Sequence, residues 1–179
     1  EFMRLFVAIN FPAEVRARLI EIRETIRRNS VSGNFTADPN LHLTLAFLGE
    51  CGKIEFELAA RAVESLVFEP FTLSLGECGR FRRGGGDVWW CGLKKSTALD
   101  ALQAEVSRRL TAAGFSLESR DYSPHITLCR EAKLKAGFVP PKAAETAFAV
   151  RSVELMKSER LGGKLTYTAV ASSLKTRAD

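Results

Sequence analysis

The chain contains two histidines, and each of them begins the same short pattern. The pattern His-x-Thr-Leu occupies residues 42–45 and returns at residues 125–128, so the second imidazole follows the first by 83 positions (125 − 42). Side chains two positions apart on a β-strand lie on the same face, so each histidine would lie beside its threonine while the residue between them points into a core. Each pattern thus offers an imidazole and a hydroxyl side by side, and its repetition indicates two related halves of the chain.

Two imidazoles and two hydroxyls around one small anion suit displacement at a cyclic phosphodiester. One neutral imidazole would accept a proton from water, and one protonated imidazole would give a proton to the departing ribose oxygen. Both forms coexist near neutral pH because the ordinary pKa of histidine is about 6.5. The hydroxyls of Thr44 and Thr127 would donate hydrogen bonds to the non-bridging phosphate oxygens. The sequence therefore predicts that His42 and His125 form a general acid–base pair.

Two other roles stay open for these histidines. A single histidine on a strand is usually structural, although a repeated pattern that uses every histidine of the chain argues against that role here. Histidines also bind metals, but a catalytic zinc site needs about three protein ligands, and no Asp or Glu stands at ligand spacing beside either pattern. The four cysteines are irregularly spaced without a C-x-x-C pair, which predicts reduced, mostly buried thiols. We therefore expect no metal and no cofactor.

Hydrophobic periodicity predicts a mixture of helices and strands. The expected helices cover residues 12–29, 53–67 and 97–113, the second of them marked by Ile54, Leu58, Ala62 and Leu66 at four-residue spacing. The expected strands cover residues 4–10, 41–48, 71–75, 88–93, 125–129, 146–157 and 165–174, with a break at 29–34 and a loop at 79–87. This order predicts an α+β fold with largely antiparallel sheets and helices packed outside them.

These residues together resemble the RNA 2′,3′-cyclic phosphodiesterase family, formerly named 2′-5′ RNA ligases, within the 2H phosphoesterase superfamily. The resemblance covers nearly the whole chain. Residues 4–9 look like the first strand of that family, and residues 40–50 and 123–130 look like its two signatures. Residues 153–158 and Tyr167 look like its C-terminal strands.

The resemblance implies both a fold and an activity. The fold would be bilobal, with two pseudo-symmetric antiparallel sheets flanking a central, positively charged cleft, and residues 3–179 would form one domain of two related lobes. The activity would be metal-independent hydrolysis of a terminal 2′,3′-cyclic phosphate on RNA to a 2′-phosphate. Joining of RNA ends through a 2′-5′ linkage would be a side activity of the same site.

The resemblance also implies a role for each residue of the two signatures. His42 would be the general acid that protonates the departing O3′, and His125 would be the general base that activates water. Thr44 and Thr127 would hold the phosphate, and Arg130, three residues after Thr127, would add positive charge beside it.

Two further sets of residues are candidates for contact with the RNA. Arg80, Arg82 and Arg83 lie in a glycine-rich segment, where they would either contact the phosphate backbone or form a solvated hairpin tip. Aromatic side chains stack on bases, and burial in the core is the alternative for each of them. The candidates for stacking are Phe47 and Tyr167, together with Phe35, Trp89 and Trp90.

Composition limits the remaining classes of protein. The chain has 179 residues, of which 46% are hydrophobic, and its net charge of +5 fits an anionic ligand without identifying one. Glu1 and Phe2 precede Met3 and look like a cloning scar. No segment approaches the ~20 apolar residues of a membrane helix, so we expect a soluble, cytoplasmic monomer. The competing hypotheses are a phosphodiesterase for a small cyclic nucleotide and a non-catalytic module that binds RNA ends.

Overall fold

The computed structural model describes residues 1–142 and 145–174, which form three α-helices, nine strands and one short 3-10 helix. The helices are α1 (Ala13–Arg28), α2 (Lys53–Glu64) and α3 (Thr97–Ala112), and the 3-10 helix is η1 (Asp38–Asn40). The strands are β1 (Met3–Ile9), β2 (Ser30–Phe35), β3 (Leu43–Cys51), β4 (Phe71–Phe81), β5 (Asp87–Leu93), β6 (His125–Leu134), β7 (Ala147–Val150), β8 (Glu154–Leu161) and β9 (Lys164–Ser172). All three predicted helices are present.

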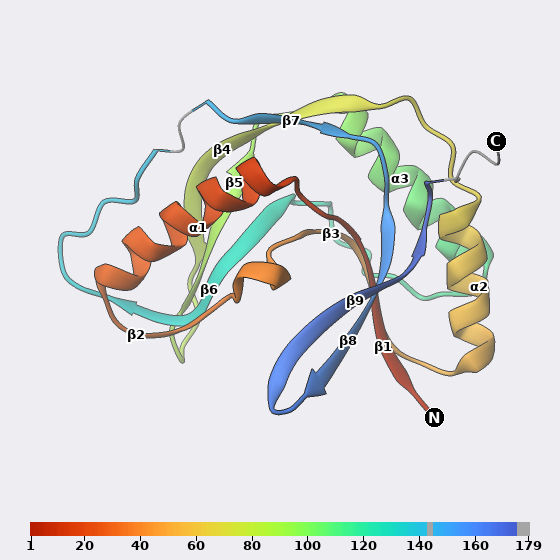
Figure 1. The fold of residues 1–179 in the computed structure, drawn as a ribbon, viewed down its shortest axis with the longest axis horizontal. Coiled ribbons are helices and arrows are strands. Elements are labelled where there is room, and N and C mark those ends of the chain that lie inside the picture. Colours follow the sequence, from red (N-terminus) through yellow and green to blue (C-terminus); the bar gives the residue numbers. More distant parts are fainter. Residues whose placement is uncertain (143–144, 175–179) are drawn as a thin grey trace.

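The strands form two antiparallel sheets, and each sheet carries one of the two His-x-Thr-Leu patterns (Figure 1). The four-stranded sheet has the order β3-β1-β8-β9, and the five-stranded sheet has the order β2-β6-β5-β4-β7. The first pattern begins directly before β3, and the second begins at the first residue of β6. The predicted α+β class with antiparallel sheets is therefore confirmed.

The helices connect the two sheets as well as covering them. α1 follows β1 in the chain but packs against β2 and β6 of the five-stranded sheet. α3 follows β5 but contacts β3 of the four-stranded sheet, where it also contacts α2. Each sheet is thus covered by a helix that follows a strand of the other sheet in the chain. Neither half can therefore be displaced without disturbing the other.

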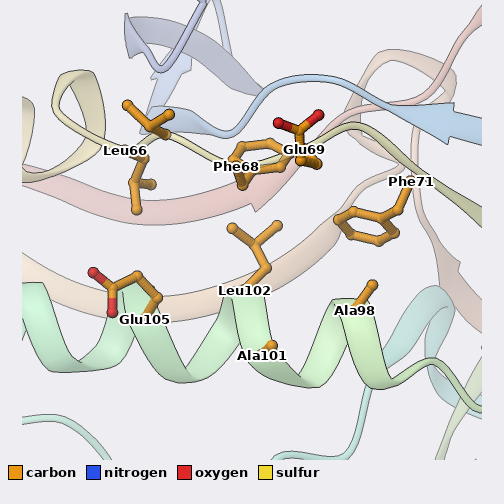
Figure 2. A pocket seen from close by; sticks show the side chains of 9 residues that line it. Leu66, Phe68, Glu69, Phe71, Ala98, Ala101, Leu102 and Glu105 are labelled. Carbon is orange, nitrogen blue, oxygen red and sulfur yellow. The ribbon is translucent and has the colours of Figure 1, made fainter.

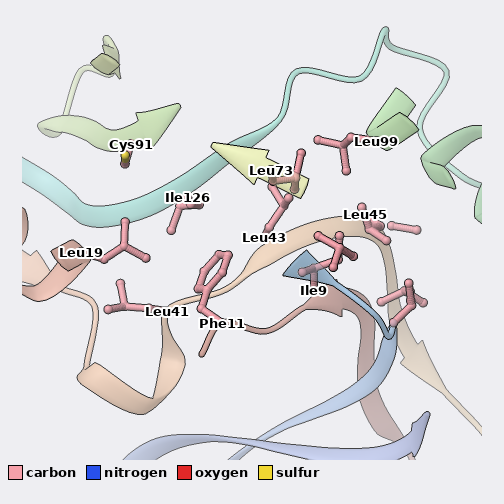
Figure 3. Packing of buried hydrophobic residues seen from close by; sticks show 14 of the residues in the cluster. Ile9, Phe11, Leu19, Leu41, Leu43, Leu45, Leu73, Cys91, Leu99 and Ile126 are labelled. Atoms are coloured by element: carbon pink, nitrogen blue, oxygen red, sulfur yellow. The ribbon is translucent and has the colours of Figure 1, made fainter. Parts of the chain in front are cut away.

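One buried cluster links the helices with both sheets (Figure 3). Leu43 of the first pattern and Ile126 of the second both lie in this cluster and are completely buried. The residue between each histidine and its threonine therefore points into the core, as the strand alternation predicts. Burial of such a side chain stabilises the fold by about 1.5–3 kcal/mol, so each pattern is anchored by its own apolar residue.

Three predicted strand assignments are wrong, each because strand pairing overrides local composition. Residues 29–34, predicted as a break, include most of β2, which pairs with β6 at the sheet edge. The strand predicted at 71–75 continues to Phe81, so the predicted loop at 79–87 begins later than expected. The strand predicted at 146–157 is two strands, β7 and β8, which belong to different sheets. The partners of β2 and β7 are distant in sequence and leave no local signal, whereas β4 is lengthened by its hairpin with β5.

The buried face of α2 also differs from the prediction. Ile54 and Leu58 are exposed, at 75% and 37% of full accessibility, whereas Ala59 and Val63 are buried. Phe56, Ala59 and Val63 also recur at helical spacing, so the predicted helix is confirmed, although of the four residues that marked it only Leu66, just beyond its end, is buried. The small Ala59 side chain allows a close approach of this face to the core.

All four cysteines are free thiols, as predicted. Cys51, Cys91 and Cys129 are buried, and Cys78 is half-buried. Burial raises the pKa of Cys51 and of Cys129 to about 11, so these two thiols stay protonated at neutral pH.

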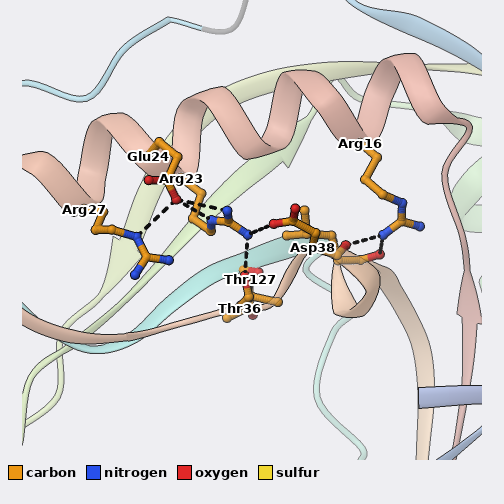
Figure 4. Close-up of polar contacts among 8 residues, drawn as sticks. Arg16, Arg23, Glu24, Arg27, Thr36, Asp38 and Thr127 are labelled. Carbon is orange, nitrogen blue, oxygen red and sulfur yellow. Dashed lines mark hydrogen bonds and ion pairs between the residues drawn. The ribbon is translucent and has the colours of Figure 1, made fainter. Parts of the chain in front are cut away.

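Two arginines of α1 hold the chain that leads to the first pattern (Figure 4). Arg23 is buried, and its Nη1 donates to the Thr36 carbonyl at 2.8 Å and to the Asp38 carboxylate. Arg16 donates from Nη1 to the carbonyl oxygens of Asp38 at 2.7 Å and Leu41 at 3.2 Å. The backbone before the first pattern is thus fixed to the helix that covers the opposite sheet.

Replacing Arg23 by methionine should lower the free energy of unfolding by about 1–3 kcal/mol, because the Thr36 carbonyl and the Asp38 carboxylate lose their donor. The measurement is urea unfolding of Arg23→Met, and Arg28→Met is the control. The Arg28 side chain is exposed and bonds only to Thr25 among the described residues, so its substitution should change stability by at most about 0.5 kcal/mol. Equal effects of the two substitutions would contradict the bracing role of Arg23.

Candidate active site

The first pattern places the His42 imidazole at the entry to β3 with partners on both ring nitrogens. Nδ1 lies 2.7 Å from the carbonyl oxygen of Asn40, and Nε2 lies 2.8 Å from Oγ1 of Thr44. A carbonyl oxygen can only accept, so Nδ1 carries a proton and donates it to Asn40. In the neutral ring Nε2 keeps its lone pair and accepts from the Thr44 hydroxyl. The predicted placing of His42 beside Thr44 is confirmed.

The Asn40 carbonyl is itself held in place. Asn40 is buried at the end of η1, and its Nδ2 donates to the carbonyl oxygen of Leu165 on β9 at 2.8 Å. The flanking carbonyls of Asp38 and Leu41 accept from Arg16. The orientation of the His42 ring therefore depends on α1 and on β9, two elements from opposite ends of the chain.

The surroundings of His42 favour its neutral form. The ring lies 4.8 Å from that of Phe6 and 5.3 Å from that of Tyr167, measured between centroids. Burial lowers the pKa of His42 below its usual value, and the neighbouring Arg130 and His125 lower it further, although the carbonyl hydrogen bond opposes them. In the free protein His42 is therefore uncharged at neutral pH.

The second pattern repeats the same hydrogen bond. Nδ1 of His125 lies 2.8 Å from the carbonyl oxygen of Ser123, which is again two residues before the histidine. Nδ1 therefore donates here too, and Nε2 keeps the lone pair of the neutral ring. Within residues 1–142 and 145–174, Nε2 of His125 has no hydrogen-bond partner, unlike Nε2 of His42.

Two aromatic rings also flank His125. Its centroid lies 5.0 Å from that of Phe81, edge-on, and 6.4 Å from that of Trp90. Trp90 needs the space left by Gly79, because a Cβ at that position would lie only 2.3 Å from the indole ring. Both imidazoles are thus positioned in the same way, by a backbone carbonyl on one side and two aromatic rings around them.

The two patterns are electrostatically coupled. Arg130 and His125 both belong to β6, yet both lower the pKa of His42 beside β3. Burial raises the pKa of Tyr167 on β9, and Arg130 opposes this shift. The structure therefore brings four of the predicted site residues into one region although they come from different sheets.

Two hydrogen bonds also join the segments that carry the patterns. Tyr122, just before the second pattern, donates its hydroxyl to the Thr44 carbonyl at 2.8 Å. The Thr36 hydroxyl donates to the Thr127 carbonyl at 3.0 Å. Thr127 pairs with Trp90 of β5. It lies two positions from His125 on β6, so its side chain is on the same face as that imidazole.

The other predicted contact residues are more peripheral. Phe47 is 51% exposed, and the Arg4 guanidinium lies 4.9 Å from its ring centroid. Arg80, Arg82 and Arg83 lie at the end of the β4–β5 hairpin, where Arg80 pairs with an aspartate. The Arg83 guanidinium lies 5.5 Å from the centroid of Phe81, and the Phe81 ring also contacts His125. Arg83 is therefore linked to the site through Phe81.

An apolar hollow of about 190 Å³ lies away from both patterns, between α3 and the segment before β4 (Figure 2). Its side chains include Leu66, Phe68 and Leu102, with the carboxylates of Glu69 and Glu105, and no cation of the described chain lines it. Such a lining does not suit a phosphate. This hollow is therefore not the candidate active site.

Sequence reasoning missed the residues that orient the imidazoles. Phe6 and Phe81 were not candidates, and Asn40 and Ser123 act through their carbonyls, which every residue type possesses. The available signal was positional, since each of these carbonyls lies two residues before a histidine. The aromatic rings come from other strands, and only the pairing of strands brings them to the imidazoles.

Metal-binding clusters and membrane-spanning helices are both absent from the part of the chain that the structure describes. No group of three or more His, Cys, Asp or Glu side chains placed to hold a metal ion occurs among residues 1–142 and 145–174. No helix in the same residues is long and apolar enough to cross a membrane.

Comparison with known proteins identifies the family. A family model for the 2′-5′ RNA ligase superfamily matches residues 11–162, which is most of the chain. The chain belongs to the 2′-5′ RNA ligase superfamily. The family resemblance stated from the two patterns is thereby confirmed.

Relatives and solved structures within this superfamily cover nearly the whole chain. The RNA 2′,3′-cyclic phosphodiesterase of Escherichia coli strain K12 is 35% identical over 170 residues, covering 94% of each protein. The protein of that name from Thermus thermophilus is 34% identical over 177 residues, covering 94% of this chain and 88% of its own. The crystal structure of E. coli LigT with 3′-AMP has a TM-score of 0.84 at 32% identity, covering 96% of this chain and 97% of that one.

The charged groups near His42 predict how the pKa of this histidine responds to substitution. In the free protein its pKa should lie below the usual value of about 6.5, and Arg130→Gln should raise it because one of the positive charges that lower it is removed. NMR titration of the ring protons is simple here because the chain contains only two histidines. Arg28→Gln, which removes a charge that has no resolved effect on His42, serves as the control. A pKa that Arg130→Gln leaves unchanged or lowers would contradict the coupling between the two sheets.

Proposed function

We propose that this member of the superfamily is an RNA 2′,3′-cyclic phosphodiesterase that opens a terminal cyclic phosphate to a 2′-phosphate. The observation that carries the proposal is the repeated geometry at His42 and His125. Each Nδ1 donates to the carbonyl two residues before it in the chain, which leaves both Nε2 atoms available for proton transfer. The names of the relatives support the choice of substrate.

The proposed reaction needs one proton to be taken and one to be given. Nε2 of His125, which has no partner among the described residues, accepts a proton from water as the water oxygen attacks phosphorus. The bond from phosphorus to O3′ breaks, and Nε2–H of His42 gives its proton to that oxygen. The products are a 2′-phosphate monoester and a free 3′-hydroxyl. Exchange with solvent then returns each imidazole to its starting state.

The phosphate would be held by hydroxyls and one cation. Thr44 and Thr127 donate to the non-bridging oxygens, and Arg130 balances the negative charge of the diester. In the free protein the Thr44 hydroxyl is hydrogen-bonded to Nε2 of His42. Binding of the phosphate would turn that hydroxyl toward the ligand. In this account the reaction needs neither a metal ion nor a cofactor.

The low pKa of His42 bears directly on its role as the acid. The free protein holds His42 in the neutral form, whereas a general acid must carry a proton. A bound phosphodiester adds a negative charge beside the ring, which raises the pKa of His42 toward the protonated form. Binding of the substrate would therefore favour the protonated form of His42, which a general acid requires.

The same site accounts for the other predicted features. If a 5′-hydroxyl of a second RNA replaces water, the reverse type of reaction joins RNA ends through a 2′-5′ linkage. Tyr167, which lies edge-on to His42, would contact the base next to the phosphate, and Phe47 would lie further along the strand. We further propose that residues 3–179 act as a single monomeric domain of two lobes, although residues 143–144 and 175–179 lie outside the described chain.

Incubation in EDTA with a short RNA ending in a 2′,3′-cyclic phosphate tests the proposal. Turnover to a 2′-phosphate should persist without metal and should fall by about 10²- to 10⁴-fold in each of His42→Ala and His125→Ala. A stoichiometric signal without turnover would favour a module that binds RNA ends. Turnover of a small 2′,3′-cyclic nucleotide in preference to RNA would favour the small-molecule alternative, and a 3′-phosphate product would overturn the choice of scissile bond.

A p-nitrophenyl phosphodiester separates the acid from the base, because its leaving phenolate needs no proton. On this substrate His42→Ala should recover most of the wild-type rate, while His125→Ala should stay slow. Thr111→Ala, an exposed substitution near the end of α3, controls for any general effect of handling or folding. Rescue of His125→Ala but not of His42→Ala would reverse the two roles.

A further inference from the structure

A second, larger hollow lies at the end of the β4–β5 hairpin. Its volume is about 660 Å³, which is within the usual range for ligand sites. The lining side chains come from the hairpin, from the end of β6 and from the residues after β6, with Trp89 and Phe138 as its aromatic part. Neither histidine lines this hollow.

The lining of this hollow is strongly basic. Arg80, Arg83, Lys133 and Lys135 contribute four positive charges, and Asp87 contributes one negative charge. Asp87 is already occupied, since it accepts from Arg80 at 3.2 Å and from the backbone N–H of Arg83 at 3.2 Å. Both lysines are exposed and have no ion pair among the described residues, and Nζ of Lys135 donates to the backbone carbonyl of Arg28 at 3.3 Å. The hollow therefore suits a ligand with more than one negative charge.

The hairpin connects this hollow to the candidate active site. Phe81 contacts the His125 ring on one face of β4, while the guanidinium of its neighbour Arg80 lies over the opposite face, 5.6 Å from the centroid of Trp89. Arg83 reaches both sides, because its guanidinium lies over Phe81 and it also lines the hollow. Arg83 thus connects the side of the hairpin that faces His125 with the hollow.

The length of the hairpin sets what such a ligand must be. His125 pairs with Gly92, and the hollow is lined by Trp89 and Asp87, which lie three and five residues along β5 from that position. At about 3.3 Å per residue the hollow extends from roughly 10 Å to roughly 17 Å from His125 along the strand, so most of it lies beyond the phosphate held at the two histidines. A flexible chain with regularly spaced phosphates can span it.

We propose that this hollow binds the backbone of single-stranded RNA several nucleotides away from the reacting end. The inference rests on the proposed function, because it takes the RNA end to lie at His42 and His125. A basic groove that follows the phosphates binds the backbone of a single strand without reading its sequence. Arg80 and Arg83 would contact the RNA backbone here, as the sequence predicts. Lys133 and Lys135 also line the hollow although the sequence did not indicate them, and Arg82 lies outside the lining.

The test compares RNAs of two lengths. Kinetics are measured on a dinucleotide with a 2′,3′-cyclic phosphate and on an RNA of about 12 nucleotides with the same end. The double variant Lys133→Gln/Lys135→Gln should leave the dinucleotide unchanged and raise KM several-fold for the longer RNA. The slope of log KM against log salt concentration for the longer RNA should fall by about 1.4, for two lost phosphate contacts.

The matched control removes the same charge elsewhere. Lys53→Gln/Lys95→Gln replaces two exposed lysines outside the hollow, one at the start of α2 and one before α3, and should behave as the wild type with both RNAs. A KM for the longer RNA that stays at the wild-type value, or that rises equally in the control, would overturn the inference.

Failure of the proposed function is distinguishable from failure of this inference. If the intact protein turns over neither RNA, the proposed function fails. Fluorescence anisotropy with the same two RNAs carrying a 2′-phosphate then tests the hollow without turnover. Weaker binding of only the longer RNA by Lys133→Gln/Lys135→Gln supports the hollow, and equal binding by variant and wild type contradicts it.

Discussion

The hydrogen bond from each imidazole Nδ1 to a backbone carbonyl is the constraint on which the site depends. It decides which ring nitrogen carries the permanent proton and therefore which nitrogen can exchange one. At His42 the acceptor is Asn40, whose own side chain is tied to β9, and whose neighbours are tied to Arg16 on α1. At His125 the acceptor is Ser123. Near His42, α1 and β9 thus hold the backbone segment that provides the Asn40 carbonyl.

The two imidazoles differ in their surroundings although their geometry repeats. His42 is more constrained, since Thr44 occupies its Nε2 and burial with nearby positive charge disfavours its protonation. Nε2 of His125 has no partner among the described residues. The lowered pKa of His42 by itself would favour a base, so the role of His42 as the general acid depends on the negative charge that a bound phosphodiester brings beside the ring.

Much of the site was predictable because it is encoded locally. The pattern His-x-Thr-Leu fixes which side chains share a face of a strand, and the burial of Leu43 and Ile126 follows from the same alternation. The helical stripe of α3 and its cap at Ser96 are local in the same sense. These features need no knowledge of distant partners.

The rest could not be predicted because it is decided by pairing between distant segments. β2 exists because β6 lies beside it, and β7 and β8 separate because they pair with different sheets. The rotation of α2 depends on the surface it covers, not on its own spacing of apolar residues. The basic hollow joins the β4–β5 hairpin to the end of β6, so its two lysines carry no signal in the sequence.

The tautomer of each neutral histidine is the most direct test of this account. Free neutral histidine in water prefers the proton on Nε2, whereas this structure requires it on Nδ1 in both rings. Nitrogen-15 NMR of the two side chains above their titration range reads the tautomer of each ring. The account predicts a protonated Nδ1 and an unprotonated Nε2 at both His42 and His125. A proton on Nε2 of either neutral ring would contradict it, because that nitrogen could then accept no proton from water or substrate.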